Sequence, residues 1–179
     1  MATGIRGYRS PHRESAAART RRAILQAAQA LLRDRPGEPT VGAIAAQAGV
    51  SRLSVYHHFG SRAGVLAAVA EAARDSSRPG GTDIRSFIAE AVAHWASDPP
   101  LFRRLTKPDG DERPRELAAR LAIDDRLRPG CSLKEAEDVI AVLTSFAAFD
   151  RLHQDARRST AAVNEILMRM AGSILNPRT

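Results

Sequence analysis

Two adjacent histidines, His57 and His58, form a pair of side chains that could do chemistry. They lie in the stretch Ser-Val-Tyr-His-His-Phe-Gly-Ser-Arg at residues 54–62. Two imidazoles could bind a metal ion or act as a catalytic base. Chelation from one helix needs ligands at i and i+4, whereas adjacent helical residues diverge by about 100°. Since no Cys, Asp or Glu lies within four residues of the pair, we expect no metal site and no catalytic site here.

Two other candidates for catalysis lie in the C-terminal half. Asp150 and His153 have the spacing of an acid–base pair, and Cys131 is the single cysteine. An enzyme built on either is an open alternative, although no third group or oxyanion hole stands at a recognisable spacing. Cys131 follows Pro129 and Gly130 at a helix start, which favours the thiolate. An oxidation sensor is a further alternative, but this sequence offers no second cysteine. We expect no catalytic residue and no cofactor.

The positive charge is concentrated at one end of the chain. Residues 1–62 hold ten arginines and three acidic residues. The difference, +7, equals the net charge of the whole sequence. The remaining basic and acidic residues cancel. A concentrated basic patch is typical of a module that binds a polyanion, because screened attraction to phosphates is short-ranged. A solvated arginine-rich tail accounts for part of the charge.

The cysteine count and hydropathy narrow the cellular setting. A single cysteine excludes an intramolecular disulfide framework and fits a reducing compartment. No run of 18 apolar residues occurs, and the first 22 residues lack the apolar stretch of a signal peptide. We therefore expect a cytoplasmic protein with no membrane partner.

The elements that would position these groups are helical. From Ala16 to Arg33 the apolar residues recur at three- and four-residue spacing, which predicts an amphipathic helix. Thr40 can cap a second, short helix that ends at Gly49, and Ser51 can cap a third. A long fourth helix follows, capped by the serine at position 61.

Beyond a Pro- and Gly-containing break at residues 76–81, helical patterns continue to the end. They cover 82–97, 100–105, 113–127, 132–153 and 159–175. No alternating strand pattern rises above noise, so we predict an all-α fold.

The stretch TVGAIAAQAGVSRLSVYHHF, residues 40–59, has the pattern of a helix-turn-helix. Two helices that cross near 90–120° need a small residue at their closest approach, a glycine at the turn and an apolar anchor on the second helix. Ala45, Gly49 and Val55 meet these needs. Burying Leu53 would rotate Val55 out of place by about 200°. We therefore expect Leu53 to be exposed. Any alanine-rich helical hairpin could mimic the pattern.

Residues 19–66 resemble the DNA-binding domain of the tetracycline-repressor (TetR) family of bacterial transcription regulators. The resemblance rests on AGVS followed by VYHHFGSR and on the leucine at position 66. It implies a homodimeric, sequence-specific DNA-binding protein, which in this family is more often a repressor that a small-molecule effector releases from a palindromic operator. An effector-independent structural DNA-binding protein is the alternative.

The resemblance also implies which residues contact DNA. Thr40, Tyr56, His58 and Arg62 would contact the phosphate backbone, and Ser51, Arg52, Leu53, Ser54 and His57 would face the major groove. Arg62 stands where the family usually has a lysine. Gly42 stands where it often has a longer polar residue, so base reading from the second helix should be weak. Plainer readings stay open, in which Tyr56 packs on the first helix and Arg52 is a solvated surface arginine.

The polar, aperiodic composition of residues 1–15 predicts a disordered basic arm. The resemblance implies a helix-turn-helix domain at 16–62 and an effector-binding and dimerisation domain at 63–179. An effector pocket would be lined by Phe87, Ile88, Val92, Trp95, Phe102, Leu105, Leu143, Phe146, Phe149 and Asp150. An ordinary core of the same residues is the alternative.

Apolar stripes on the last two helices, one of them through Ile140 and Leu143 and the other through Val163 and Leu167, would form a four-helix dimer interface. A monomeric bundle that buries the same stripes is the alternative.

Overall fold

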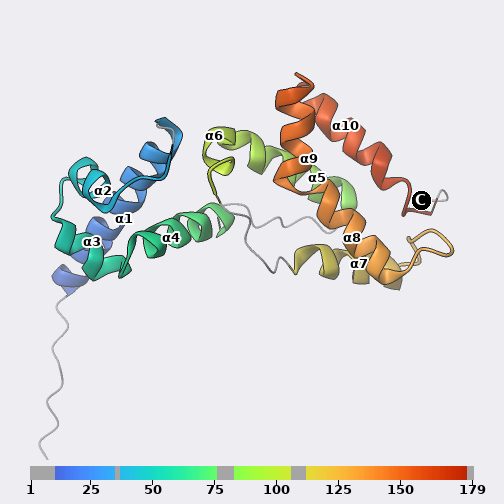
Figure 1. The fold of residues 1–179 in the computed structure, drawn as a ribbon. Helices are drawn as coiled ribbons and strands as arrows, with labels where there is room; N and C mark the ends of the chain where they lie inside the picture. Colours follow the sequence, from blue (N-terminus) through green and yellow to red (C-terminus); the bar gives the residue numbers. More distant parts are fainter. Residues whose placement is uncertain (1–10, 35–36, 76–82, 106–111, 177–179) are drawn as a thin grey trace, which may run out of the picture. The chain divides into compact units, whose positions relative to one another are not determined.

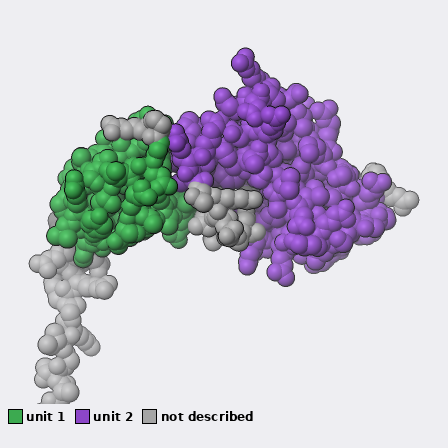
Figure 2. Space-filling model, viewed as in Figure 1, with its two compact units in different colours: residues 1–72 green, residues 73–179 purple. Residues whose placement is uncertain are grey.

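The computed structural model describes residues 11–34, 37–75, 83–105 and 112–176. Within these ranges the secondary structure is helical, and the predicted all-α fold is confirmed. The chain divides into two compact units, residues 1–72 and 73–179 (Figure 2). The boundary lies ten residues beyond the predicted one, so most of the fourth helix belongs with the N-terminal unit.

The N-terminal unit consists of α1 (Pro11–Asp34), α2 (Val41–Ala48), α3 (Arg52–Phe59) and most of α4 (Arg62–Asp75), drawn in blue to green in Figure 1. The predicted arm at 1–15 is too long, because α1 begins at Pro11. Proline suits the first turn of a helix, where its missing N–H has no partner to lose. The rest of the predicted arm, residues 1–10, lies outside the described residues.

Short polar side chains cap the helices of this unit where the sequence predicts them. Thr40 Oγ1 accepts a hydrogen bond from Ala43 N at 3.2 Å, and Ser51 Oγ accepts one from Ser54 N at 3.0 Å. Gly49 ends α2 with a φ of +66°. Because this left-handed conformation is strained for residues with a side chain, the glycine makes the tight turn into α3 possible.

The core of the N-terminal unit is small and aliphatic. Its fully buried side chains include Ile24 of α1, Ile44 of α2, Val55 of α3 and Val65 and Val69 of α4. Each of the four helices therefore contributes at least one inward residue, and α2 packs against both α1 and α3. Burial of these side chains is the main stabilising term for so small a unit.

The C-terminal unit consists of α5 (Ile84–Ser97), α6 (Pro99–Phe102), α7 (Arg113–Ile123), α8 (Leu133–Leu143), α9 (Phe146–Asp150), the π-helical turn η1 (Arg151–Asp155) and α10 (Thr160–Ala171). Figure 1 shows α7 beside α8 and α10 beside α5, and these helix pairs are in contact. Their core is formed by Ile88, Leu117, Ile140, Phe149 and Leu167 with their buried neighbours. An antiparallel bridge between Leu127 and Leu175 ties the loop after α7 to the segment after α10.

The single helix predicted at residues 132–153 is wrong, because the chain breaks after Leu143. Thr144 Oγ1 donates a hydrogen bond to the Ile140 carbonyl, and Ser145 Oγ accepts one from Ala148 N. Such hydroxyl groups compete with the backbone for hydrogen bonds and favour a new helix start. The apolar stripe crosses the break without interruption, so periodicity alone gave no sign of it.

The N-terminal core predicts different outcomes for two large aliphatic residues in adjacent helices. Ile44→Ala should lower the free energy of unfolding of this unit by about 2–5 kcal/mol, because it leaves a cavity in the core. Leu53→Ala should change it by about 0.5 kcal/mol or less, since Leu53 is exposed. Hydrogen exchange of the α1–α3 amides measures both values, and equal losses in the two variants would contradict this core.

Candidate nucleic-acid interface

Helix α3 presents one face to the core and the opposite face to solvent. Val55 is fully buried, whereas 77% of Leu53 is exposed. Arg52, Tyr56 and His57 are also exposed. The predicted orientation of α3 is therefore confirmed at Val55 and Leu53. The exposed face of α3 carries apolar, hydrogen-bonding and cationic side chains.

Arg21 of α1 holds the C-terminal end of α3, a role that sequence reasoning missed. Its Nη1 donates a hydrogen bond to the His58 carbonyl at 3.2 Å, and its guanidinium lies 4.4 Å from the centre of the Phe59 ring. The Phe59 side chain is partly buried. A cation near the last carbonyls of a helix is favourable, and so is one over an aromatic ring. No local pattern separates Arg21 from the neighbouring Arg19 and Arg22.

Arg62 at the start of α4 forms an ion pair that the sequence did not predict. Its Nη2 lies 2.7 Å from Glu38 Oε2, and both side chains are about half exposed. Ion pairs at such exposed positions contribute little, about 0–1 kcal/mol. An anion that approached this end of α4 would compete with Glu38 for the guanidinium.

Arg52, the first residue of α3, lies back over α2. A Cβ atom added to Gly42 would be 3.0 Å from Arg52 Nη2 and 3.3 Å from Cζ. The guanidinium therefore occupies the space next to the glycine. Within the residues that the structure describes, Arg52 has no ion pair and no hydrogen-bonding side-chain partner.

The remaining predicted contact residues lie in the same unit. Thr40 and Ser51 are exposed, while Ser54 and His58 are partly buried. Ser54 Oγ shares a hydrogen bond of 2.9 Å with Ser51 Oγ. The rings of His57 and His58 lie edge to face, with centroids 5.6 Å apart. The site thus extends from the N-terminal end of α2 along α3 to the start of α4.

The predicted effector-pocket residues fall into two groups in the C-terminal unit. Phe87, Ile88, Val92, Leu143 and Phe149 are buried in its core, as the ordinary-core alternative expects. Trp95, Phe102 and Phe146 form an aromatic cluster, in which the Trp95 ring centre lies 4.9 Å from that of Phe102 and 5.6 Å from that of Phe146. Leu105 is partly buried after α6.

Polar groups border this aromatic cluster. Trp95 Nε1 donates a hydrogen bond to the Thr144 carbonyl at 2.9 Å. The His94 ring centre lies 4.5 Å from those of both Trp95 and Phe102. Burial lowers the pKa of His94 to about 4, with a smaller contribution from the positive charge of Arg113. The imidazole is therefore neutral at physiological pH.

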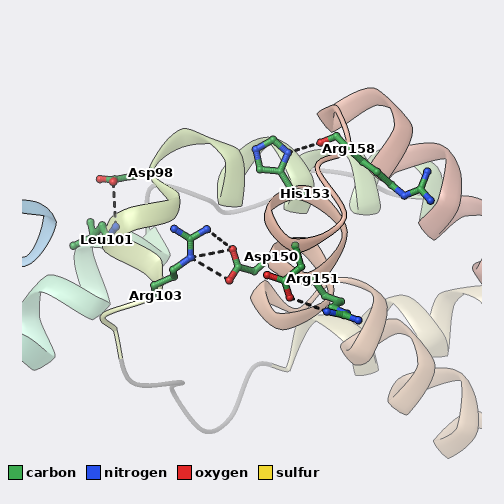
Figure 3. Close-up of polar contacts among 8 residues, drawn as sticks. Asp98, Leu101, Arg103, Asp150, Arg151, His153 and Arg158 are labelled. Carbon is green, nitrogen blue, oxygen red and sulfur yellow. Dashed lines mark hydrogen bonds and ion pairs between the residues drawn. The ribbon is translucent and has the colours of Figure 1, made fainter. Parts of the chain in front are cut away.

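The proposed Asp150–His153 acid–base pair is not formed (Figure 3). Arg103 Nε and Nη2 both donate to the Asp150 carboxylate, with a shortest distance of 2.6 Å. His153 Nδ1 lies 2.8 Å from the Arg158 carbonyl. Asp150 and His153 therefore have different partners. The hydrogen bonds between Arg103 and Asp150 connect the end of α6 to α9. This geometry gives no support to the enzyme alternative.

Cys131 does not have the reactive character that its position suggested. Burial raises the pKa of its thiol, and the negative charge of Glu135 adds to the effect. Both effects disfavour the thiolate that the position at a helix start suggested.

The described ranges contain no group of three or more side chains of His, Cys, Asp or Glu placed to hold a metal ion. None of the helices described there has the length and apolar character needed to cross a bilayer.

The lowered pKa of His94 predicts a pH-dependent stability of the C-terminal unit. The unfolded chain binds a proton below about pH 6.5, but the folded unit does so only near pH 4. Stability should therefore fall as the pH drops from 6.5 to about 4. Trp95 is the single tryptophan, so its fluorescence follows urea unfolding of this unit.

The variant His94→Gln should show a smaller fall in the urea midpoint over this range. His57→Gln is the matched control, because it removes an exposed histidine from the other unit. Equal falls in the wild type and His94→Gln would contradict the lowered pKa.

Residues 24–69 match the family model described as bacterial regulatory proteins, tetR family. No curated protein matches the chain. Among solved structures, the chain is similar to TylP, a tetR regulator from Streptomyces fradiae, at a TM-score of 0.69 and 19% identity over 90% of this chain and 89% of that one. It is also similar to NalD, the secondary repressor of the MexAB-OprM multidrug efflux pump in Pseudomonas aeruginosa, at 0.70 and 21% over 91% and 99%.

A third similar structure is a gamma-butyrolactone receptor, an ArpA-like protein, at a TM-score of 0.58 and 20% identity over 91% and 92% of the two chains. At these identities the structures establish the fold of the chain, while the family model covers the helix-turn-helix segment. Residues 24–69 thus carry the sequence pattern of the bacterial tetR family of regulatory proteins, and the chain has the fold of regulators of that family.

Proposed function

We propose that this protein is a sequence-specific DNA-binding transcriptional regulator whose helix α3 enters the major groove. The orientation of α3 is the observation on which the proposal chiefly rests: Val55 is buried, and Arg52, Leu53 and His57 are exposed. An exposed helix face with cationic and hydrogen-bonding groups can contact the edges of bases in the major groove.

The contacts divide between the backbone and the bases. Thr40, Tyr56, His58 and Arg62 contact phosphates, while Ser51, Arg52, Leu53, Ser54 and His57 face the groove. The Thr40 hydroxyl accepts a capping hydrogen bond and keeps its own proton to donate, while Ser51 and Ser54 share one hydrogen bond and leave one hydroxyl proton between them to donate. Leu53 offers only apolar contact, for example to a thymine methyl.

The regulator acts as a homodimer on a palindromic operator. In the single chain the predicted stripe residues Ile140, Leu143, Val163 and Leu167 are already buried in the unit's own core. The interface would therefore use the exposed residues of these adjacent helices. Val142 of α8 is 61% exposed and Met170 of α10 is 52% exposed, which supports a contact between copies through this helix pair.

A small-molecule effector controls the regulator through the C-terminal unit, and the regulator is a repressor that the effector releases. Two proteins whose solved structures have the same fold are a repressor and a gamma-butyrolactone receptor. The aromatic cluster around Trp95, with neutral His94 and the Arg103–Asp150 pair at its border, supplies apolar walls and polar groups of the kind that orient small ligands. Release requires that the effector bind the two conformations with different affinities.

The decisive experiment is selection of bound duplexes from random DNA with the full-length protein. We expect enrichment of a palindrome with half-sites about one helical turn apart. Sequence-independent enrichment would instead favour the effector-independent structural DNA-binding protein. If the effector releases a repressor, it should lower the affinity of the protein for the selected palindrome. An effector that raised this affinity would contradict this part of the proposal.

The Arg62–Glu38 pair predicts a variant that binds DNA more tightly than the wild type. Glu38→Gln frees Arg62 for a phosphate and removes a negative charge, so affinity should rise about two- to fivefold. The slope of log affinity against log salt should steepen by up to about one, because Glu38 no longer competes with the phosphate for Arg62. Both are measured by titrating the selected duplex at several salt concentrations.

Two controls separate the release of Arg62 from a general effect of charge. Glu71→Gln removes the same charge from exposed Glu71 in α4 without freeing Arg62. In the Arg62→Ala background, Glu38→Gln should give no steeper slope. A steeper slope in that double variant would show that Arg62 is not the phosphate contact.

A further inference from the structure

Gly42 and Arg52 fit each other across the α2–α3 crossing. A Cβ atom at position 42 would lie 3.0 Å from Arg52 Nη2, 3.2 Å from Nε and 3.3 Å from Cζ. These three atoms belong to the guanidinium group, so that group lies next to the position that a Cβ atom of residue 42 would take. Even the smallest side chain at position 42 would press on the charged end of Arg52.

The fit depends on shape rather than on a charge partner. Arg21 is held by the His58 carbonyl and the Phe59 ring, and Arg62 by Glu38. Among the described residues, nothing of this kind holds Arg52. Its backbone, however, is fixed by the Ser51 cap at the start of α3. The guanidinium therefore rests against α2 because Gly42 leaves room for it.

We propose that Gly42 is a positioning residue that sets where the Arg52 guanidinium meets the operator, and thereby determines the base preferred at one operator position. The inference rests on the proposed function, because it needs α3 in the major groove. An arginine that reads guanine uses two parallel hydrogen bonds to O6 and N7. Such a bidentate contact is sensitive to small displacements. A residue that shifts the guanidinium group therefore alters the preference for a base without touching DNA.

The test compares affinities for the selected palindrome and for a set of duplexes with every single-base change in one half-site. The proteins are the wild type, Gly42→Ala, Gly42→Met, Arg52→Ala and the double variant Gly42→Ala with Arg52→Ala. Arg52→Ala should lower discrimination by roughly tenfold at one position, the value of a good bidentate pair. Gly42→Ala should lower it several-fold at that same position, and the longer Gly42→Met should lower it further.

The double variant separates positioning from a merely structural role. Once Arg52 is absent, Gly42→Ala should change discrimination less than twofold at every position. Gln47→Ala, at an exposed position near the end of the same helix, is the control for general changes in α2. Because alanine is a better helix former than glycine, hydrogen exchange of the α2 amides is measured in parallel. A gain in helix stability changes affinity for all duplexes alike and leaves discrimination unchanged.

Two outcomes would overturn the proposal, and they are distinguishable. If Gly42→Ala leaves every preference unchanged, or acts equally with and without Arg52, Gly42 does not position Arg52, although the protein can still be a sequence-specific regulator. If the wild type selects no sequence at all, the proposed function fails and this inference fails with it.

Discussion

The burial of Val55 against the helices around it is the constraint on which the N-terminal unit depends. A helix of eight residues has too few backbone hydrogen bonds to be stable alone, so α3 exists only while it is packed. Val55 also fixes the rotation of α3 about its own axis. With that residue fully buried, Leu53 must point outward, and Arg52 and His57 remain accessible. The same contact therefore stabilises the helix and orients its exposed face.

Much of this unit could be predicted because its determinants are local. Caps such as Thr40 and Ser51 and the left-handed turn at Gly49 act within four residues, and the sequence pattern reveals them directly. The contacts of Arg21 with α3, and the pair between Glu38 and Arg62, join residues that lie 24 to 38 positions apart. No periodicity encodes such contacts, because any of the neighbouring arginines has the same propensity and charge.

The C-terminal unit was harder to predict for a different reason. An apolar stripe shows that a helix has a buried side, but it does not say whether the unit's own core or a second copy covers it. Ile140 and Leu167 proved to be core residues, while the exposed Val142 had not been placed in a stripe. The break at Thr144 and Ser145 depends on side-chain hydrogen bonds that compete with the helix, and these residues occur within helices as well.

The outward face of α3 has a consequence for how such a protein can diverge. Arg52, Leu53 and His57 contribute nothing to the buried core, so an exchange at any of them costs the fold little. Under the proposed function, one copy can therefore acquire a new target after a gene duplication while its folding, capping and turn remain intact. Position 42 is the exception, because a Cβ atom there on α2 would lie 3.0 Å from Arg52 Nη2 on α3. The exposed face of α3 can vary freely, whereas a side chain at this crossing has to be accommodated by Arg52.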